Sequence, residues 1–145
     1  MSAKSDTAAE IFSKGFNCAQ AVLAALSSEY GVDSATAKKI AGAFGGGIAS
    51  NGDVCGAVSG ALMVIGLRYG KYKEDDTVSK ENTYRIANEY MEKFKKEFGS
   101  IKCKELIKYS LNKKEELLKA REAGVFKTIC PEFVKRSVEL AEEVL

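Results

Sequence analysis

The segment of residues 44–67 reads FGGGIASNGDVCGAVSGALMVIGL and decides the fold. Its three successive glycines disfavour a helix interior, because glycine loses more backbone entropy than other residues when a helix forms. After the Asn51-Gly52 turn dipeptide, Asp53 is expected to cap a helix through its carboxylate. The run Val54–Leu67 contains no charged residue and, at 14 residues, is too short to cross a bilayer. A helix that is apolar all round is normally buried, so we predict a buried central helix over about Asp53–Tyr69.

Helical periodicity continues on both sides of this segment, interrupted by glycines and polar stretches. The further helices expected are Ala3–Lys14, Cys18–Tyr30, Ala35–Phe44, Ser79–Phe98, Lys102–Tyr109, Lys113–Gly124 and Pro131–Leu145. Asn17 is a strong N-cap candidate for the second of them, because its side chain can accept a first-turn amide. Apolar residues of the long helix recur at intervals of three and four and are expected in the core: Tyr84, Ala87, Tyr90, Met91, Phe94 and Phe98. Because no segment shows strand periodicity, we predict an all-α fold, one domain over residues 1–145 with about six to eight helices.

Composition excludes several functional classes. The 22 basic and 20 acidic residues are interspersed, so we expect no basic patch for nucleic acid and no membrane partner. Residues 1–7 lack the basic start and apolar run of a signal peptide, which predicts a cytoplasmic protein. The lysines and glutamates between Lys102 and Glu122 are interpreted as a solvent-exposed face. The chain contains no histidine, which excludes that residue as a general base, metal ligand or haem ligand.

The cysteines share one feature: each lies at or within one turn of a predicted helix start. They are Cys18, Cys55, Cys103 and Cys130. Unpaired amides and the positive end of the helix dipole favour a thiolate, and such positions lower a cysteine pKa from about 8.5 toward roughly 3.5–7.5. Cys55 begins the central helix, so we expect it to be the most reactive of these thiols.

The same segments resemble a known family. The stretch GFNCAQAV at residues 15–22, CGAVSG at residues 55–60, the lone Cys103 and the Cys130-Pro131 pair are similar to the C_GCAxxG_C_C family of "putative redox-active" proteins. That family is recognised by four cysteines and a C-G-A-x-x-G motif, and the resemblance spans nearly the whole chain. It implies a helical protein with thiol redox or cluster chemistry centred on these cysteines.

Three interpretations of the cysteines remain open. The first is thiol–disulfide exchange or electron transfer by a thiol oxidoreductase with an unidentified redox partner, although the chain has no Cys-x-x-Cys pair. The second is a metal centre of Zn or a two-iron (2Fe–2S) cluster, held by Cys18, Cys55, Cys103 and Cys130. The third is a helical scaffold with inert buried thiols. A homodimer is compatible with each interpretation.

A redox or metal centre requires cysteines that are distant in sequence to converge. Either interpretation therefore predicts that Cys18 or Cys55 meets Cys103 or Cys130. Gly56 and Gly60 lie four residues apart on one face of the central helix, and small residues at this spacing favour close approach of a second backbone. The glycines at residues 45–47 are interpreted as a helix stop and turn, with an anion-binding nest as the alternative.

Overall fold

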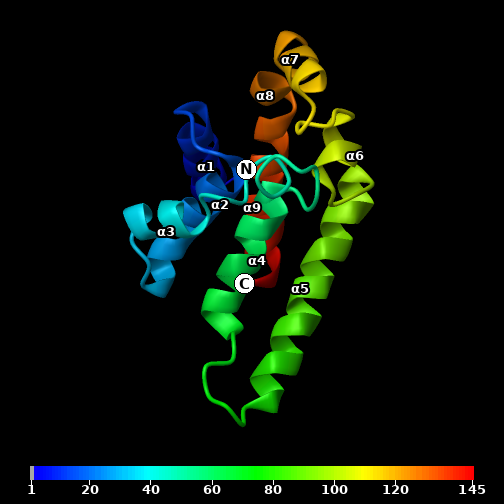
Figure 1. Cartoon of the computed structure of the whole chain (residues 1–145). Helices are drawn as coiled ribbons and strands as arrows, with labels where there is room; N and C mark the ends of the chain where they lie inside the picture. The colour runs from blue at the N-terminus through cyan, green and yellow to red at the C-terminus, as the bar shows by residue number, and fades with distance from the viewer. Residues whose placement is uncertain (1) are drawn as a thin grey trace.

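The computed structural model describes residues 2–145, which form an all-α fold (Figure 1). A single isolated antiparallel bridge, Val54 with Lys102, is the one β-type pairing among these residues. The predicted fold class is confirmed. The helices are α1 (Ala3–Ser13), α2 (Cys18–Ser27), the 3-10 helix η1 (Ser28–Tyr30), α3 (Ser34–Ile40), α4 (Gly56–Tyr69), α5 (Thr77–Phe98), α6 (Cys103–Ile107), α7 (Lys114–Glu122), α8 (Val125–Thr128) and α9 (Cys130–Val144).

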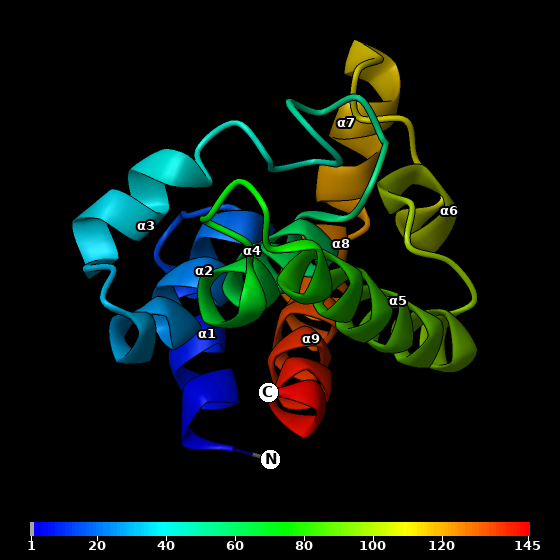
Figure 2. The ribbon, with the colours of Figure 1, turned by 90° about the horizontal axis from the view of Figure 1, so that it is seen from below.

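Helix α4 is the central element, as the apolar run predicts. It contacts α2, α5 and α9, and Figure 2 shows it between α2 and α5. The first part of α4 is buried almost completely, whereas Leu67 near its end is 41% exposed. The other helices therefore cover α4 mainly along its N-terminal half, which is the end that carries the CGAVSG motif.

The start of α4 differs from the prediction. The helix begins at Gly56 with Cys55 as its N-cap residue, so Asp53 does not cap it. The backbone of Asp53 is held elsewhere: its amide donates to Gly47 O at 2.9 Å, and its carbonyl accepts from Cys103 N at 2.7 Å. Because these bonds keep the chain extended through residues 53–55, the helix cannot begin earlier.

Two glycines let α2 and α4 approach closely. A Cβ atom placed on Gly56 would lie 2.9 Å from the backbone nitrogen of Ala19 and 2.9 Å from the carbonyl oxygen of Phe44. A Cβ atom on Gly60 would lie 2.8 Å from the carbonyl oxygen of Ala19. Contacts this short with backbone atoms exclude any side chain at either position, so the predicted close approach is confirmed.

The apolar row of α5 is buried in part. Tyr90 and Phe94 are fully buried, and the ring of Phe98 packs 4.8 Å from that of Phe94, centroid to centroid. Tyr84 is 61% exposed, which contradicts its predicted place in the core. At 3.6 residues per turn, a residue six positions before Tyr90 lies well off its face, and Ile86, four positions before it, is buried instead.

A buried polar chain joins the three helices of the core. The Tyr90 hydroxyl of α5 lies 2.6 Å from Ser137 Oγ of α9, and Ser137 Oγ donates to the carbonyl oxygen of Ala57 in α4 at 2.7 Å. Since that bond uses the serine hydrogen, the tyrosine hydroxyl donates to Ser137. Every buried polar side-chain atom described has a hydrogen-bond partner.

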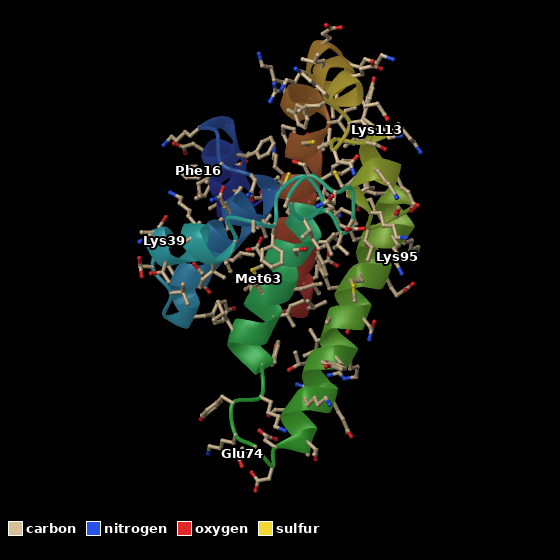
Figure 3. All side chains as sticks on the ribbon, viewed as in Figure 1. Phe16, Lys39, Met63, Glu74, Lys95 and Lys113 are labelled. Carbon is tan, nitrogen blue, oxygen red and sulfur yellow. The ribbon has the colours of Figure 1, made fainter. Side chains whose placement is uncertain are left out.

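Charged side chains lie on the outer surface. Lys39, Lys95 and Lys113 are exposed and extend outward in Figure 3. Two helix boundaries differ from the prediction. The third helix ends at Ile40 instead of Phe44, and Gly124, with a φ of 73°, separates α7 from α8. Within residues 2–145, no helix combines the length and the apolar character needed to cross a membrane.

Candidate functional site

A left-handed loop lies between α3 and α4. Five successive residues, Gly46 to Ser50, have φ angles of 61°, 71°, 66°, 48° and 66°. The last three are not glycine, and the left-handed conformation costs such residues roughly 1–2 kcal/mol each. Backbone bonds hold the turn, including Ser50 N to Gly45 O at 3.0 Å and Gly52 N to Gly46 O at 3.1 Å. The predicted helix stop is thus an ordered turn whose strain is typical of a functional site.

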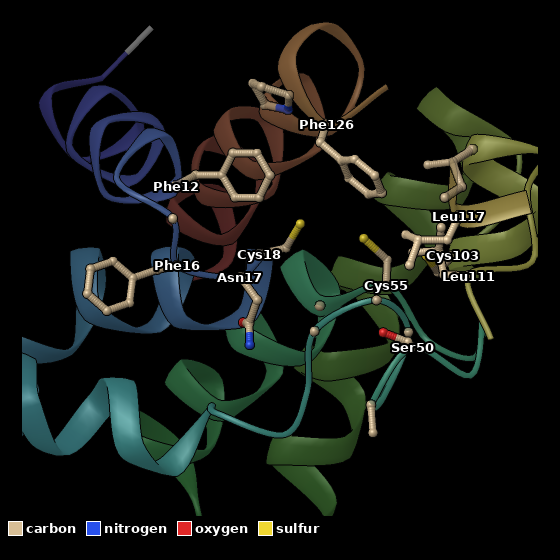
Figure 4. A pocket seen from close by; sticks show the side chains of 18 of the residues that line it. Phe12, Phe16, Asn17, Cys18, Ser50, Cys55, Cys103, Leu111, Leu117 and Phe126 are labelled. Atoms are coloured by element: carbon tan, nitrogen blue, oxygen red, sulfur yellow. The ribbon is translucent and has the colours of Figure 1, made fainter. Parts of the chain in front are cut away.

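This loop forms one wall of a cavity of about 850 Å³. The other walls come from the end of α1, the starts of α2 and α4, and the segments α6 to α8. Cys18, Cys55 and Cys103 line the cavity, and Pro131, the neighbour of Cys130, also lines it. In Figure 4 the sulfur atoms of Cys18 and Cys55 point toward one another across this space. The predicted convergence of cysteines from distant segments is therefore observed.

Each cysteine begins a helix, as the sequence predicts. Cys18, Cys103 and Cys130 are the first residues of α2, α6 and α9, and Cys55 is the N-cap residue of α4. Cys18 owes its place to Asn17, whose Oδ1 accepts from Gln20 N at 2.8 Å, while Gln20 Oε1 accepts from Asn17 N at 2.9 Å. This reciprocal cap confirms the predicted N-cap and fixes the first turn of α2.

Backbone pairing places Cys55 beside Cys103. The amide of Cys55 donates to the carbonyl oxygen of Ile101, and the amide of Cys103 donates to that of Asp53, both at 2.7 Å. The Val54–Lys102 bridge lies between these two bonds. Successive side chains of an extended segment point to opposite faces, so Cys55 and Cys103 share the face opposite to that of the bridge residues.

Cys18 and Cys130 form a hydrogen-bonded pair of thiols. All four cysteines are free, and this is the pair in which one side chain donates directly to the other. The bond lowers the pKa of Cys130, because the Cys18 thiol donates to the Cys130 thiolate. The same bond, followed by burial and the neighbouring cysteines, raises the pKa of Cys18 well above its usual value. The pair therefore gives up its first proton more readily than its second.

The two remaining cysteines are held as thiols. Burial raises the pKa of Cys55 to about 11, although the amides of Ala57 and Val58 favour its thiolate. Burial raises the pKa of Cys103 to about 12, and the charges of Cys55 and Cys130 act in the same direction. The prediction of a lowered pKa at each helix start is thus wrong for Cys18, Cys55 and Cys103, because other effects outweigh the helix amides. The raised pKa of Cys55 argues against the expectation that it is the most reactive thiol, which remains a prediction for alkylation rates to test.

A metal centre needs several ligand side chains that surround one point. Among residues 2–145, no three cysteine, aspartate or glutamate side chains are arranged to hold a metal ion. Cys18 and Cys130 form one hydrogen-bonded pair, and Cys55 and Cys103 are two buried thiols that flank the Val54–Lys102 bridge. This arrangement does not fit the tetrahedral thiolate set that zinc or a 2Fe–2S cluster requires.

Two cations at the cavity were missed by the sequence analysis. Arg121 of α7 and Lys127 of α8 line it together with Phe126. Arg121 falls within the stretch interpreted as a solvent-exposed face. It is indeed exposed, but it lies at the rim of the cavity. No local signal separates it from its charged neighbours, since its role depends on how α7 packs.

Most of the chain, including all four cysteines, matches one protein family. Residues 16–144 match the family described as "Putative redox-active protein (C_GCAxxG_C_C)". No curated protein and no solved structure matches the chain. The matched range contains all four cysteines and most of the residues that line the cavity. The chain therefore belongs to the C_GCAxxG_C_C family.

Proposed function

We propose that this protein is a thiol–disulfide redox protein in which Cys18 and Cys130 are the exchanging pair. The observation that carries the proposal is the hydrogen bond between these two thiols beside a cavity. Disulfide exchange needs a thiolate, a second thiol within bonding reach, and access for the partner disulfide. The family match supports redox chemistry in general, and the pair supports this form of it.

The two cysteines differ in access, which assigns their roles. Cys18 is half-buried and lines the cavity, whereas Cys130 is 6% exposed and is not among the lining residues. Cys18 is therefore the thiol that meets the substrate disulfide. Cys130 lies behind it, accepts its proton and later resolves the mixed disulfide.

The first step forms a mixed disulfide. The proton of the Cys18 thiol passes along the hydrogen bond to the Cys130 thiolate, and the Cys18 sulfur attacks one sulfur of a disulfide R–S–S–R. The bond between the two substrate sulfurs breaks, one R–S⁻ leaves, and Cys18–S–S–R remains. Starting from a pair that holds one proton, charge and atoms balance.

The second step releases the product. The Cys130 thiol gives its proton to the departed thiolate, attacks the Cys18 sulfur and expels the second R–S⁻, which leaves a Cys18–Cys130 disulfide. Two electrons pass from the protein pair to the substrate. The reverse sequence oxidises a dithiol. Burial raises the pKa of Cys55 and of Cys103, as it does for Cys18, but neither is hydrogen-bonded to a second cysteine that could take its proton, so they do not compete.

The proposal is tested with a neutral small disulfide, hydroxyethyl disulfide. Reduced wild-type protein should lose two of its four thiols, and peptide mass spectrometry should find a Cys18–Cys130 cross-link. The Cys130→Ser variant should accumulate the reagent on Cys18, because no resolving thiol is left. The Cys18→Ser variant should react at least about tenfold more slowly than the wild type, since Cys130 is shielded from the cavity.

A Cys103→Ser variant is the matched control, because it removes a cavity cysteine outside the pair. It should still form the Cys18–Cys130 cross-link. A cross-link joining a different pair of cysteines in the wild type would overturn the assignment. First attack by Cys55 or Cys103 in the Cys130→Ser variant would do the same.

A further inference from the structure

We infer that the cavity beside Cys18 accepts a small organic anion with an apolar body, and that the disulfide exchanged there carries carboxylate groups. The second half of this inference rests on the proposed function, whereas the first half concerns binding alone. It is carried by the charges that line the cavity and by the nature of its walls.

The charged residues that line the cavity are both cations. Arg121 and Lys127 lie on its rim, and no aspartate or glutamate lines it. Both cations are exposed, and neither makes an ion pair or side-chain hydrogen bond within residues 2–145. This contrasts with Arg136, which is bound by Glu97 at 2.7 Å and by Glu139 at 2.8 Å. Two cations without a protein partner on one rim favour a ligand of opposite charge.

The backbone adds positive electrostatic potential at the cavity. Three helices of 10, 14 and 15 residues, α2, α4 and α9, begin at residues that line the cavity or adjoin it: Cys18, Gly56 and Cys130, the last of which precedes the lining residue Pro131. The N-terminal end of a helix carries a partial positive charge and unpaired amides. These ends reinforce the two cations, so an anionic group is favoured in the interior as well as at the rim.

The cavity walls are largely apolar, which favours an organic anion over an inorganic one. Phe12, Phe16 and Phe126 contribute aromatic surface, and Ile107, Leu111 and Leu117 add aliphatic surface. A volume of about 850 Å³ is in the range that holds organic ligands of drug size. A ligand that fills it must bury apolar groups against these side chains. An aromatic or aliphatic disulfide with carboxylates supplies both the negative charge that the cations favour and the apolar body that the walls favour. A cationic disulfide supplies only the apolar body.

The experiment compares three reagents that react with thiols by the same exchange: dithiobis(nitrobenzoate), which is anionic and aromatic, dithiodipyridine, which is neutral and aromatic, and cystamine, which is cationic. Because the leaving thiols of the three reagents differ in acidity, each variant's rate constant is compared with the wild-type value for the same reagent. In the Arg121→Gln/Lys127→Gln variant the rate constant with the anionic reagent should fall about fivefold or more. The rate constant with dithiodipyridine should change less than about twofold, because the thiols themselves are unaltered.

Lys114→Gln/Lys119→Gln is the matched control, since both lysines are exposed on α7 and neither lines the cavity. It should leave all three rate constants within about twofold of wild type. An equal fall for all three reagents in the Arg121→Gln/Lys127→Gln variant would overturn the inference, because it would indicate a change in the thiols. An unchanged rate with the anionic reagent would overturn it as well.

A second measurement separates binding from chemistry. Anilinonaphthalene sulfonate is an aromatic anion without a disulfide, and its fluorescence reports binding to the wild type and both double variants. Weaker binding in the Arg121→Gln/Lys127→Gln variant alone supports an anion-accepting cavity, even if no Cys18–Cys130 cross-link forms and the proposed function fails. Equal affinity in the three proteins contradicts the inference, whatever the outcome for the cross-link.

Discussion

At the scale of single residues, Gly56 is where packing and reactivity meet. An added Cβ atom would lie 2.9 Å from backbone atoms of Ala19 and Phe44 and 3.1 Å from Cys18 Cβ. Backbone atoms cannot yield as the end of a flexible side chain can. The helix core and the proposed nucleophile therefore depend on the same missing side chain.

Gly56→Ala should lower the free energy of unfolding and slow the reaction of Cys18. Overpacking costs roughly 1–3 kcal/mol, which exceeds the gain of about 1 kcal/mol from replacing a helical glycine with alanine. Cys18 should react more slowly with iodoacetamide, because its own Cβ lies against the added methyl group. Urea denaturation and alkylation followed by mass spectrometry measure the two effects.

Gly66→Ala is the control in the same helix. A Cβ atom on Gly66 would meet nothing within 4 Å, so this change should raise stability by up to about 1 kcal/mol and leave Cys18 unaffected. A Gly56→Ala protein that is more stable than wild type, with unchanged alkylation, would show that the motif is ordinary buried helix.

At the scale of elements, Ser137 joins three helices. Its hydroxyl accepts from Tyr90 of α5 and donates to the carbonyl of Ala57 in α4, one residue into the helix that follows Cys55. Ser137 and Tyr90 are both fully buried, so the bond between them is shielded from solvent. The site end of α4 is thereby tied to α5 and α9.

Ser137→Ala should destabilise the protein more than Tyr90→Phe. Removing the serine leaves the buried tyrosine hydroxyl without a partner, at a cost of about 1–3 kcal/mol, and also removes the bond that the Ala57 carbonyl accepts in addition to its helical one. Removing the tyrosine hydroxyl leaves the bond from Ser137 to Ala57 intact and should cost about 1 kcal/mol. Urea denaturation of the two variants gives the comparison. Equal losses of stability would contradict the prediction, because they would mean that Ser137 contributes no more than its bond with Tyr90.

The elements also show where sequence reasoning succeeds. The cap at Asn17 could be predicted because its partner, Gln20, lies three residues away and the bond is local. The cap at Asp53 was wrongly predicted, because residues 101–103, far along the chain, hold its backbone extended. The pairing of Cys18 with Cys130 and the role of Arg121 could not be read locally, since both depend on how distant helices pack.

At the scale of the whole molecule, the cysteine pair joins the two ends of the chain. Cys18 begins α2 and Cys130 begins α9, and these helices pack against one another, as do α1 and α9 (Figure 1). Roughly 110 residues separate the two cysteines, and they include the glycine-rich loop, α4 and α5. A disulfide between them would enclose most of the core in one covalent loop.

Oxidation of the pair should therefore stabilise the protein against urea. Closing a loop of this length removes conformational entropy from the unfolded chain, worth about 4–5 kcal/mol in the chain-entropy treatment. The reduced state loses its bond from the Cys18 thiol to the Cys130 thiolate on oxidation, which offsets about 1.5–3 kcal/mol of that gain. The expected net stabilisation is about 1–3.5 kcal/mol, measured from urea curves of oxidised and fully reduced wild type.

The Cys130→Ser variant, treated in the same way, supplies the reference and should show no such difference. By thermodynamic linkage, the stabilisation equals the amount by which folding makes the disulfide harder to reduce than it is in the unfolded chain. A large stabilisation thus describes a pair that is a good reductant and is poised to pass electrons to a substrate disulfide. Equal or lower stability of the oxidised protein would instead describe an oxidising pair, and the electrons would then flow from a substrate dithiol into the protein.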